Sequence, residues 1–226
     1  MSLVHEIALA GSQTDEAAAM NLLDALRAER WAQLAPSALD IYRPVGGTQD
    51  PYNKDEGPPL LIIMAEFHSI DACNAAVPVL EQALADLPSS VGATVTAMER
   101  RFYPVAGEAA AGPLRAPFSY VVRYYRPAED EAAFVKHYVA DHPRLEAAFP
   151  RIRSIMCYFP LVQRSSRQVP AADYMLGNEV VFDSVDDFNV AMQSPVRHEM
   201  RAHFHSFPKF SGPVTHFPML RQRLAG

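Results

Sequence analysis

The chain of 226 residues has little cysteine and no long apolar run. Its two cysteines, Cys73 and Cys157, do not have the spacing of a metal or redox motif, and one disulfide could not hold so long a chain together. No stretch approaches the roughly 18 apolar residues that a membrane-spanning helix needs. The first residues lack the basic flank and apolar core of a signal peptide, so we expect a cytoplasmic protein with reduced thiols.

Positive charge is also scarce, and several familiar binding motifs are missing. Lysine and arginine total 20 against 26 aspartates and glutamates, and the net charge of −6 argues against nucleic acid or an anionic membrane as partner. The sequence has no phosphate-binding glycine loop, no Gly-x-Ser-x-Gly turn and no dinucleotide fingerprint. Redox chemistry with a bound nucleotide is therefore disfavoured, and no cofactor is predicted. The 49% hydrophobic and 20% charged residues are typical of a globular protein.

The sequence resembles itself after a shift of about 115 positions. Residues 67–76, FHSIDACNAA, align with residues 182–191, FDSVDDFNVA, at a shift of 182 − 67 = 115, and share Phe, Ser, Asp, Asn and the final Ala. Three further matches lie within one position of that shift: residues 15–18 with 130–133, 42–44 with 158–160, and 102–104 with 216–218. Four matches in the same order indicate a tandem duplication.

The duplication gives two repeats with the same predicted order of elements, β-α-β-β-α-β, which is called ferredoxin-like. The first repeat takes residues 1–104, a linker rich in alanine, glycine and proline takes 105–117, and the second repeat takes 118–226. Strands are predicted at Leu3–Ala10, Ala38–Pro44, Leu60–Phe67, Thr94–Pro104, Phe118–Tyr125, Ile152–Val162, Tyr174–Phe182 and Pro213–Met219. Helices are predicted over Thr14–Arg30 and Glu129–Phe149, and from Ser69 and Ser184 as N-caps.

A ferredoxin-like unit has helices on one face of its sheet and leaves the other face bare. Such an apolar face must be covered. Two units on one chain cover each other when their sheets stack and enclose a barrel with the helices outside. We therefore predict an α+β protein in which two tandem ferredoxin-like repeats pack sheet to sheet into an intrachain α/β barrel, with a ligand-sized cavity inside it.

Three segments of the second repeat resemble a known family. They are Phe134–Leu145, FVKHYVADHPRL, then Glu179–Ser184, EVVFDS, and Ser194-Pro195 followed by Phe204. On these residues the stretch Ser119–Pro218 resembles the EthD-like family of the dimeric α/β-barrel superfamily. Relatives of this fold include cofactor-free isomerases and lyases of aromatic catabolism, polyketide cyclases and small monooxygenases. Others have no established reaction, so the resemblance implies a pocket more firmly than a chemistry.

The first repeat lacks the histidines of this motif. With the shift of 115 positions, Leu22 takes the place of His137 and Arg27 takes the place of His142. We therefore predict a degenerate site in the first repeat and a single functional pocket in each chain, formed mainly by residues 118–218.

His142 is the first candidate for chemistry. On a helix it points with Tyr138 along the apolar stripe, and Pro143 is expected to break or kink the helix beside it. The kink would aim the imidazole into the barrel mouth, where it could act as general acid and base. The other interpretation is a core histidine that holds the kink. His137, at the edge of the stripe and one turn from Asp141, is a second candidate.

Strand alternation adds candidates from the sheet. Glu179 is predicted to point into the barrel, as is Glu66 in the first repeat. Glu179 would assist His142 as a proton carrier or, in the alternative, pair with Arg123 or another inward arginine. Arg123 and Tyr125 lie on the strand face that we assign to the barrel, where the Arg123 guanidinium would hold a substrate oxygen. Tyr125 and Glu66 would provide further substrate contacts.

The tail over residues 198–207 contains three histidines and several aromatic residues. His203 and His205 could chelate a metal from a strand but not from a helix, and no ligand pair elsewhere completes such a site, so no metal is predicted. We interpret the tail as an aromatic flap across the barrel mouth. Phe204 in this flap and Tyr138 on the helix are expected to contact the substrate.

These residues favour a cofactor-independent enzyme that acts by proton transfer, as an isomerase, lyase or cyclase, on a small apolar molecule of aromatic or lactone-like type. A non-catalytic protein that binds a small molecule or a partner is the alternative, and a cofactor-free monooxygenase is a further one. His142 and Glu179 directed into one cavity would favour an enzyme, whereas a His142 sealed by core contacts would favour a binder. Formation of a homodimer is left open.

Overall fold

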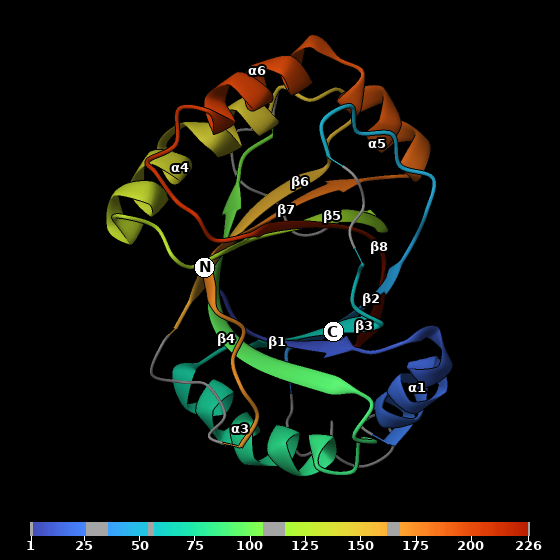
Figure 1. Cartoon of the computed structure of the whole chain (residues 1–226). Helices are drawn as coiled ribbons and strands as arrows, with labels where there is room; N and C mark the ends of the chain where they lie inside the picture. The colour runs from blue at the N-terminus through green and yellow to red at the C-terminus, as the bar shows by residue number, and fades with distance from the viewer. Residues whose placement is uncertain (1, 26–35, 54–56, 106–115, 162–167, 226) are drawn as a thin grey trace.

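The computed structural model describes residues 2–25, 36–53, 57–105, 116–161 and 168–225 (Figure 1). The first part of the chain forms β1 (Ser2–Ala10), η1 (Gln13–Asp15), α1 (Glu16–Ala25), β2 (Ala38–Pro44), β3 (Leu61–Phe67), α3 (Ile70–Leu84) and β4 (Gly92–Tyr103). The second part forms β5 (Phe118–Tyr125), α4 (Glu131–Glu146), β6 (Ser154–Pro160), β7 (Tyr174–Phe182), α5 (Val185–Met192), α6 (Pro195–Phe204) and β8 (Val214–Ala225). The strands agree with the prediction to within a few residues, except that β8 extends further toward the C-terminus.

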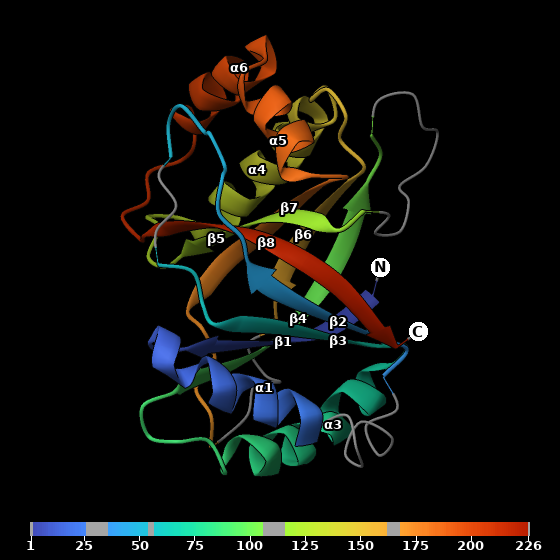
Figure 2. The same cartoon turned by 90° about the vertical axis from the view of Figure 1, so that its right-hand side faces the viewer.

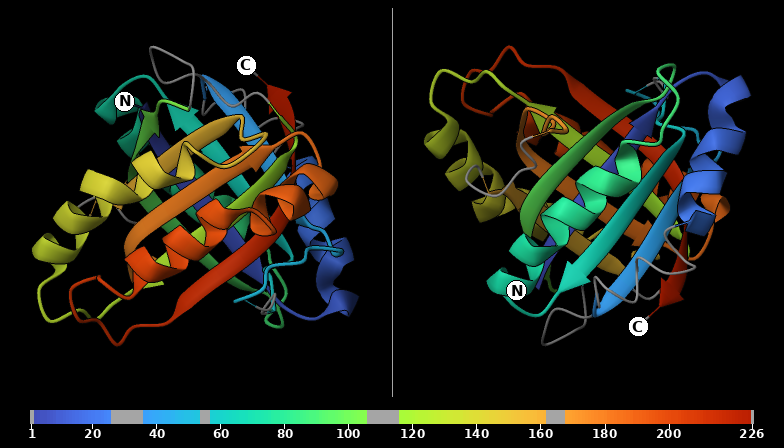
Figure 3. Two further views of the ribbon diagram at one scale, coloured as in Figure 1. Left: turned by 90° about the horizontal axis from the view of Figure 1, so that it is seen from above. Right: turned by 90° about the horizontal axis from the view of Figure 1, so that it is seen from below.

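In the described residues, eight strands form a closed antiparallel barrel in the order β1-β3-β2-β8-β5-β7-β6-β4. The two parts of the chain join where β2 pairs with β8 and where β4 pairs with β6. Helices α1 and α3 lie on one side of the barrel, and α4, α5 and α6 lie on the opposite side (Figure 1, Figure 3). The predicted α+β barrel with outer helices is therefore confirmed. The two sets of four strands continue into one another at both edges instead of stacking as separate sheets, which leaves no edge unpaired.

Each strand turns one face toward the barrel interior and the other toward the helices. The side chains inside the barrel form one cluster, the interior cluster, which includes Val4, Met64 and Met156. On β5, Val121 belongs to this interior cluster, whereas Tyr120 and Val122 belong to the core between the sheet and the helices of the second part. On β7, Val181 faces the interior and Val180 faces the helices. The orientation that the sequence predicts for these two strands is confirmed.

The barrel interior holds large side chains and a network of buried polar groups. Arg123 on β5 donates to Glu6 on β1, with an Nε–Oε2 distance of 3.1 Å, and both side chains are buried. This ion pair therefore links the two parts of the chain. Glu179 accepts hydrogen bonds of 2.6 Å from Ser119 Oγ and from Tyr158 OH. Arg123 thus pairs with Glu6 and not with Glu179, contrary to the alternative drawn from the sequence.

Both serine caps predicted from the sequence are present. Ser69 Oγ accepts a hydrogen bond from the backbone N–H of Ala72 at 3.1 Å, where α3 begins. Ser184 Oγ accepts from the backbone N–H of Asp187 at 3.1 Å, where α5 begins. Each cap satisfies a backbone donor that the first turn of a helix leaves unpaired.

Two features of the second part differ from what the sequence predicts. Of the break or kink expected beside Pro143, the break is wrong, because the α4 helix continues as one element to Glu146 with Pro143 inside it. Proline removes one backbone hydrogen bond, and the side chains buried beneath α4 hold the helix together despite that loss. The tail is not a flap over the barrel mouth, because Pro195–Phe204 form the α6 helix, which packs against α4. Proline in a first turn is a helix-start signal that the prediction did not use.

Some predicted features lie outside the described residues. These are most of the linker 105–117, the end of the first helix and, within it, Arg27. Among the helices that are described, none has both the length and the apolar character needed to cross a membrane.

Candidate functional site

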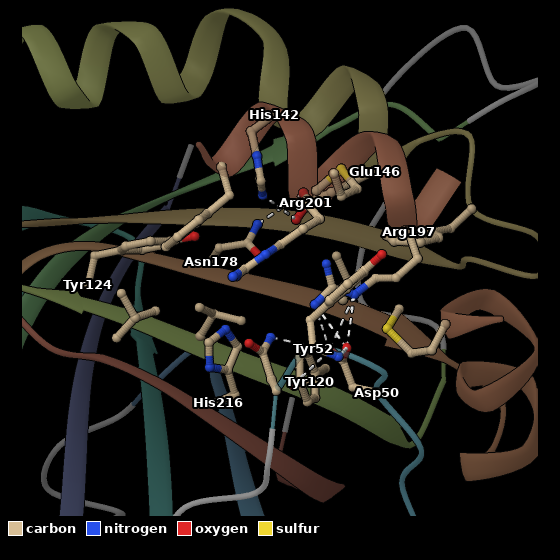
Figure 4. Close-up of a pocket in the computed structure, with 18 of the residues that line it drawn as sticks. Asp50, Tyr52, Tyr120, Tyr124, His142, Glu146, Asn178, Arg197, Arg201 and His216 are labelled. Carbon is tan, nitrogen blue, oxygen red and sulfur yellow. Dashed lines mark hydrogen bonds and ion pairs between the residues drawn. The ribbon is translucent and has the colours of Figure 1, made fainter. Parts of the chain in front are cut away.

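A pocket of about 430 Å³ lies between the outer face of the barrel and the helices of the second part. Strands β5, β7 and β8 form its floor, and α4, α5 and α6 form its roof. The connection between β2 and β3 closes one side with Asp50, Tyr52 and Asn53 (Figure 4). This pocket is not the barrel cavity that the sequence analysis predicts. It lies outside the barrel, whose interior contains large buried side chains such as Arg123 and Tyr158.

Two side chains of α4 form a close pair in the pocket wall. His142 and Glu146 are four residues apart, so they share one face of the helix. His142 Nε2 lies 3.8 Å from Glu146 Oε1. On the floor, Asn178 Nδ2 donates to Glu146 Oε2 at 3.0 Å and to the carbonyl oxygen of Met156 at 3.3 Å (Figure 4). Asn178 therefore fixes the position of the carboxyl group.

The enclosure of these two groups controls their charge. Burial raises the pKa of Glu146 to about 8, although the hydrogen bond from Asn178 opposes the shift. Burial also lowers the pKa of His142 well below its ordinary value, and the nearby His203 and Arg197 lower it further. At neutral pH the carboxyl group therefore holds its proton and the imidazole is uncharged. Neutral acid and neutral base stand side by side.

A second histidine lies behind His142. The Nδ1 atoms of His142 and His203 are 3.0 Å apart, so one of them carries the hydrogen and the other accepts it. When the hydrogen is on Nδ1 of His142, its Nε2 is free to accept a proton on the side of Glu146. His142 also packs on Tyr138, with ring centroids 4.4 Å apart. Its ring is thus held from two sides while it still lines the pocket.

An ion pair holds the β2–β3 connection against α6. Both carboxylate oxygens of Asp50 accept from Arg197 Nε and Nη2, at distances between 2.9 and 3.3 Å. Tyr52 OH hydrogen-bonds His198 Nδ1, and the backbone N–H of Gln49 donates to the side chain of Asn189 at 2.8 Å. The light-blue segment after β2 runs up beside α5 and α6 (Figure 2). A part of the first half of the chain therefore completes a pocket of the second half.

Three of the predicted site residues line the pocket: His142, Tyr138 and Phe204. His137 does not line it. Its ring stacks on His203 at 5.2 Å, and its Nε2 lies 3.2 Å from Ser206 Oγ.

The other predicted site residues lie in the barrel and not in the pocket. Glu179 and Arg123 belong to the buried interior network described above. Glu66 pairs with Arg100 inside the barrel, and Tyr125 packs against the interior cluster. His142 and Glu179 therefore do not share a cavity. His142 lines a pocket, but that pocket lies on the opposite face of the sheet from Glu179. The structure therefore matches neither the shared cavity expected of an enzyme nor the sealed His142 expected of a binder.

Several polar residues of the pocket were not predicted from the sequence, among them Asp50, Glu146, Asn178, Arg197 and Arg201. Glu146 had a usable signal, because it follows His142 by four residues on the same predicted helix. Asn178 had a weaker one, since it is the neighbour of Glu179 and so faces the helices. Asp50, Arg197 and Arg201 come from segments that meet only in the folded protein.

The histidines of the tail diverge in the fold. His203 contacts His142, His198 contacts Tyr52, and His205 ends the α6 helix in an exposed position. Within the described ranges, no group of three or more histidine, cysteine, aspartate or glutamate side chains is arranged to hold a metal ion.

No protein-family model and no curated protein matches this sequence. Solved structures do match the fold. A candidate monooxygenase from Lactobacillus acidophilus is 11% identical with a TM-score of 0.52, over 100% of this chain and 97% of that one. An anthrone oxidase-like protein is 10% identical with a TM-score of 0.56, over 100% and 94%. A candidate chlorite dismutase is 10% identical with a TM-score of 0.54, over 97% and 96%.

At such low identity these similarities show a shared fold and no specific activity. Membership of the dimeric α/β-barrel superfamily, and of the EthD-like family within it, stays a prediction from the sequence.

Proposed function

We propose that the protein is an enzyme that transfers protons on a small, largely aromatic or apolar molecule held in the pocket outside the barrel. The observation that carries the proposal is the close approach of two buried side chains, His142 and Glu146, 3.8 Å apart in the wall of a pocket large enough for such a molecule. Burial favours the neutral form of both groups. A general base and a general acid work best in these protonation states.

The step is a keto–enol conversion. His142 Nε2 takes a proton from the carbon next to a substrate carbonyl, and the C–H electron pair forms a carbon–carbon double bond. The carbonyl electron pair moves to oxygen, which receives the proton of Glu146. The net charge of the substrate does not change in this step, while the two side chains become an imidazolium and a carboxylate. In a substrate with a carbon–carbon double bond next to that carbon, the product is a dienol. The imidazolium of His142 then gives its proton to the far carbon of the dienol, the enol O–H returns its proton to Glu146, and the carbonyl group reforms with the double bond moved by one position.

Neighbouring residues prepare this pair for the step. Asn178 orients the Glu146 carboxyl group, and its amide N–H would stabilise the carboxylate that forms. His203 holds one tautomer of His142 through the contact between their Nδ1 atoms. Tyr120 and Tyr124 on the floor provide aromatic surface for an apolar substrate. Glu179, Arg123, Glu66 and Tyr125, which lie in the barrel, are assigned to its stability instead.

A cofactor-free monooxygenase is the second candidate. Two of the similar structures are named as a candidate monooxygenase and an anthrone oxidase-like protein. The same abstraction by His142 leaves an electron-rich carbon that O₂ can oxidise. A CH₂ group would become a carbonyl, with one oxygen atom entering the product and the other leaving as water. Oxygen uptake distinguishes this reaction from isomerisation.

The two-repeat origin of the chain is part of the proposal. Both parts pair their four strands in the same relative order, β4-β1-β3-β2 in one and β8-β5-β7-β6 in the other. Leu22, which takes the place of His137, is buried in the hydrophobic core beneath α1 and α3. A duplication in which residues 118–226 kept the pocket and residues 1–104 became a support accounts for both observations.

Proton exchange in D₂O tests the function without a known substrate. Aromatic ketones and lactones are incubated with the protein, and NMR follows deuterium entering the carbon next to the carbonyl. We expect the protein to accelerate exchange for at least one compound, and H142Q and E146Q to lose about 100-fold or more of that rate. H205Q, which changes an exposed histidine, should keep it. No acceleration with any compound, or full acceleration by H142Q, would favour a non-catalytic binder.

A further inference from the structure

The charges of the pocket do not balance. Among its lining residues, Asp50 and Arg197 neutralise each other in a bidentate ion pair. Glu146 and His142 are both uncharged at neutral pH, for the reasons given above. Burial lowers the pKa of His216 to about 4, so this side chain is uncharged as well. The remaining charged group in the lining is Arg201.

Arg201 is placed for a ligand and not for a protein carboxylate. Its guanidinium lies 5.5 Å from the ring centroid of Tyr52 and 5.3 Å from that of Phe204. Across the described part of the chain, it has no carboxylate within 4.0 Å, whereas the neighbouring Arg197 pairs with Asp50. The Arg201 side chain runs from α6 into the space beside Asn178 and Glu146 (Figure 4). Two aromatic rings hold the side chain while its donors remain available.

We propose that the pocket binds a molecule with a single negative charge, an aromatic or apolar acid whose anionic oxygens are held by Arg201. This inference deepens the proposed function, because it gives the charge of the substrate. A planar guanidinium holds a carboxylate through two parallel hydrogen bonds and so also fixes its orientation. A second anionic group would have no free cation in the described lining. A neutral molecule would leave the Arg201 charge uncompensated in a partly enclosed site.

A pair of probes with the same shape and different charge tests this inference. We would titrate 2-naphthoate and the neutral 2-naphthamide into the full chain at pH 7 and low salt, by calorimetry. Charge-assisted hydrogen bonds should make the carboxylate bind about 10- to 100-fold more tightly than the amide. R201M should lose this preference and R201K should keep part of it. R153M removes an exposed arginine that pairs with Asp183 and does not line the pocket, so this variant should bind as the unchanged protein does.

Equal affinity for both probes, no binding of either probe, or a preference that survives in R201M overturns the inference. Melting curves show that each variant is folded before it is titrated. The two proposals fail separately. If the protein accelerates no proton exchange but still prefers 2-naphthoate to 2-naphthamide through Arg201, the proposed enzymatic activity is overturned and the anion site stands. Proton exchange on neutral ketones together with equal affinity for both probes would overturn only the anion site.

Discussion

Burial, more than the choice of partners, sets the charges of His142 and Glu146. Each is almost fully enclosed, and enclosure disfavours the charged form of either group. An exposed histidine and glutamate four residues apart would form an ordinary ion pair at neutral pH. Here the same two residues stay neutral, so a general acid and a general base lie next to each other before the reaction. They become an ion pair only when the protons are transferred.

Glu146 makes the stability of the protein depend on pH in a definite direction. Its pKa rises from 4.5 in the unfolded chain to about 8 in the fold, so the folded protein keeps a proton that the unfolded chain releases. Stability is therefore lost as pH rises from about 4.5 to about 8, by a few kcal/mol. Urea unfolding at pH 5 and pH 8 should show a smaller difference for E146Q. The same difference in both proteins would contradict the shift.

At the level of side chains, the sequence identifies one half of the pair. His142 stands out because a histidine in an apolar stripe beside a proline is unusual. Glu146 does not stand out, because a glutamate near the end of a helix is commonly solvated. Its burial depends on α6 covering α4, whereas the sequence-based interpretation of that segment is an aromatic flap across the barrel mouth. The error over α6 therefore also concealed Arg197 and Arg201, which that helix carries into the pocket.

Among the elements, the β2–β3 connection and α6 depend on each other. The side chain of Asp50 is 2% exposed, and the side chain of Arg197, with which it pairs, is 10% exposed. Strand positions were predictable because alternation and β-branched residues indicate them locally. The contact between this connection and α6 was not predictable, since 147 positions separate Asp50 from Arg197 in the sequence and no periodic pattern links the two.

Asp50→Asn should loosen this contact. It leaves the Arg197 guanidinium with a neutral partner in a partly buried place, so unfolding free energy should fall by about 1–3 kcal/mol. D183N removes one partner of the exposed Asp183–Arg153 pair and should cost less than about 1 kcal/mol. Urea unfolding of both variants measures the difference. Equal costs would mean that the connection is not held by this ion pair.

Across the entire barrel, the two parts of the chain are joined by strand pairing and by buried charge. Glu6 and Arg123 come from different parts and meet inside the barrel, away from water. The closed barrel was predictable from the repeat, because a bare apolar sheet face needs cover. The side of the sheet on which the pocket lies was not predictable, because it depends on how side chains from both parts of the chain pack inside the barrel.

Glu6→Gln should cost about 3–5 kcal/mol of unfolding free energy, because it leaves Arg123 charged and unpaired in the interior. The double variant E6Q/R123M removes both charges and should recover part of the loss. Denaturant unfolding of the single and double variants gives the comparison. A single variant as stable as the original protein would show that the pair is not needed.

The variants Leu22→Ala and H142Q should distinguish a stabilising role of the first part of the chain from a catalytic role of the second part. Leu22 is buried in the core beneath α1 and α3, so its truncation should cost about 2–5 kcal/mol while the folded protein keeps proton exchange. H142Q should lose exchange with little change in melting temperature. Equal loss of exchange in the two variants would refute a single site in the second part.

NMR titration of Glu146 examines the acid–base pair without a substrate. The protein is labelled with ¹³C at the glutamate carboxyl carbons, and the Glu146 signal is assigned by its absence in E146Q. The proposal predicts that this carbon titrates near pH 8 and is protonated at pH 7. A Glu146 that titrates near 4.5, as in an unfolded chain, would make it an ordinary carboxylate and leave the pocket without its acid.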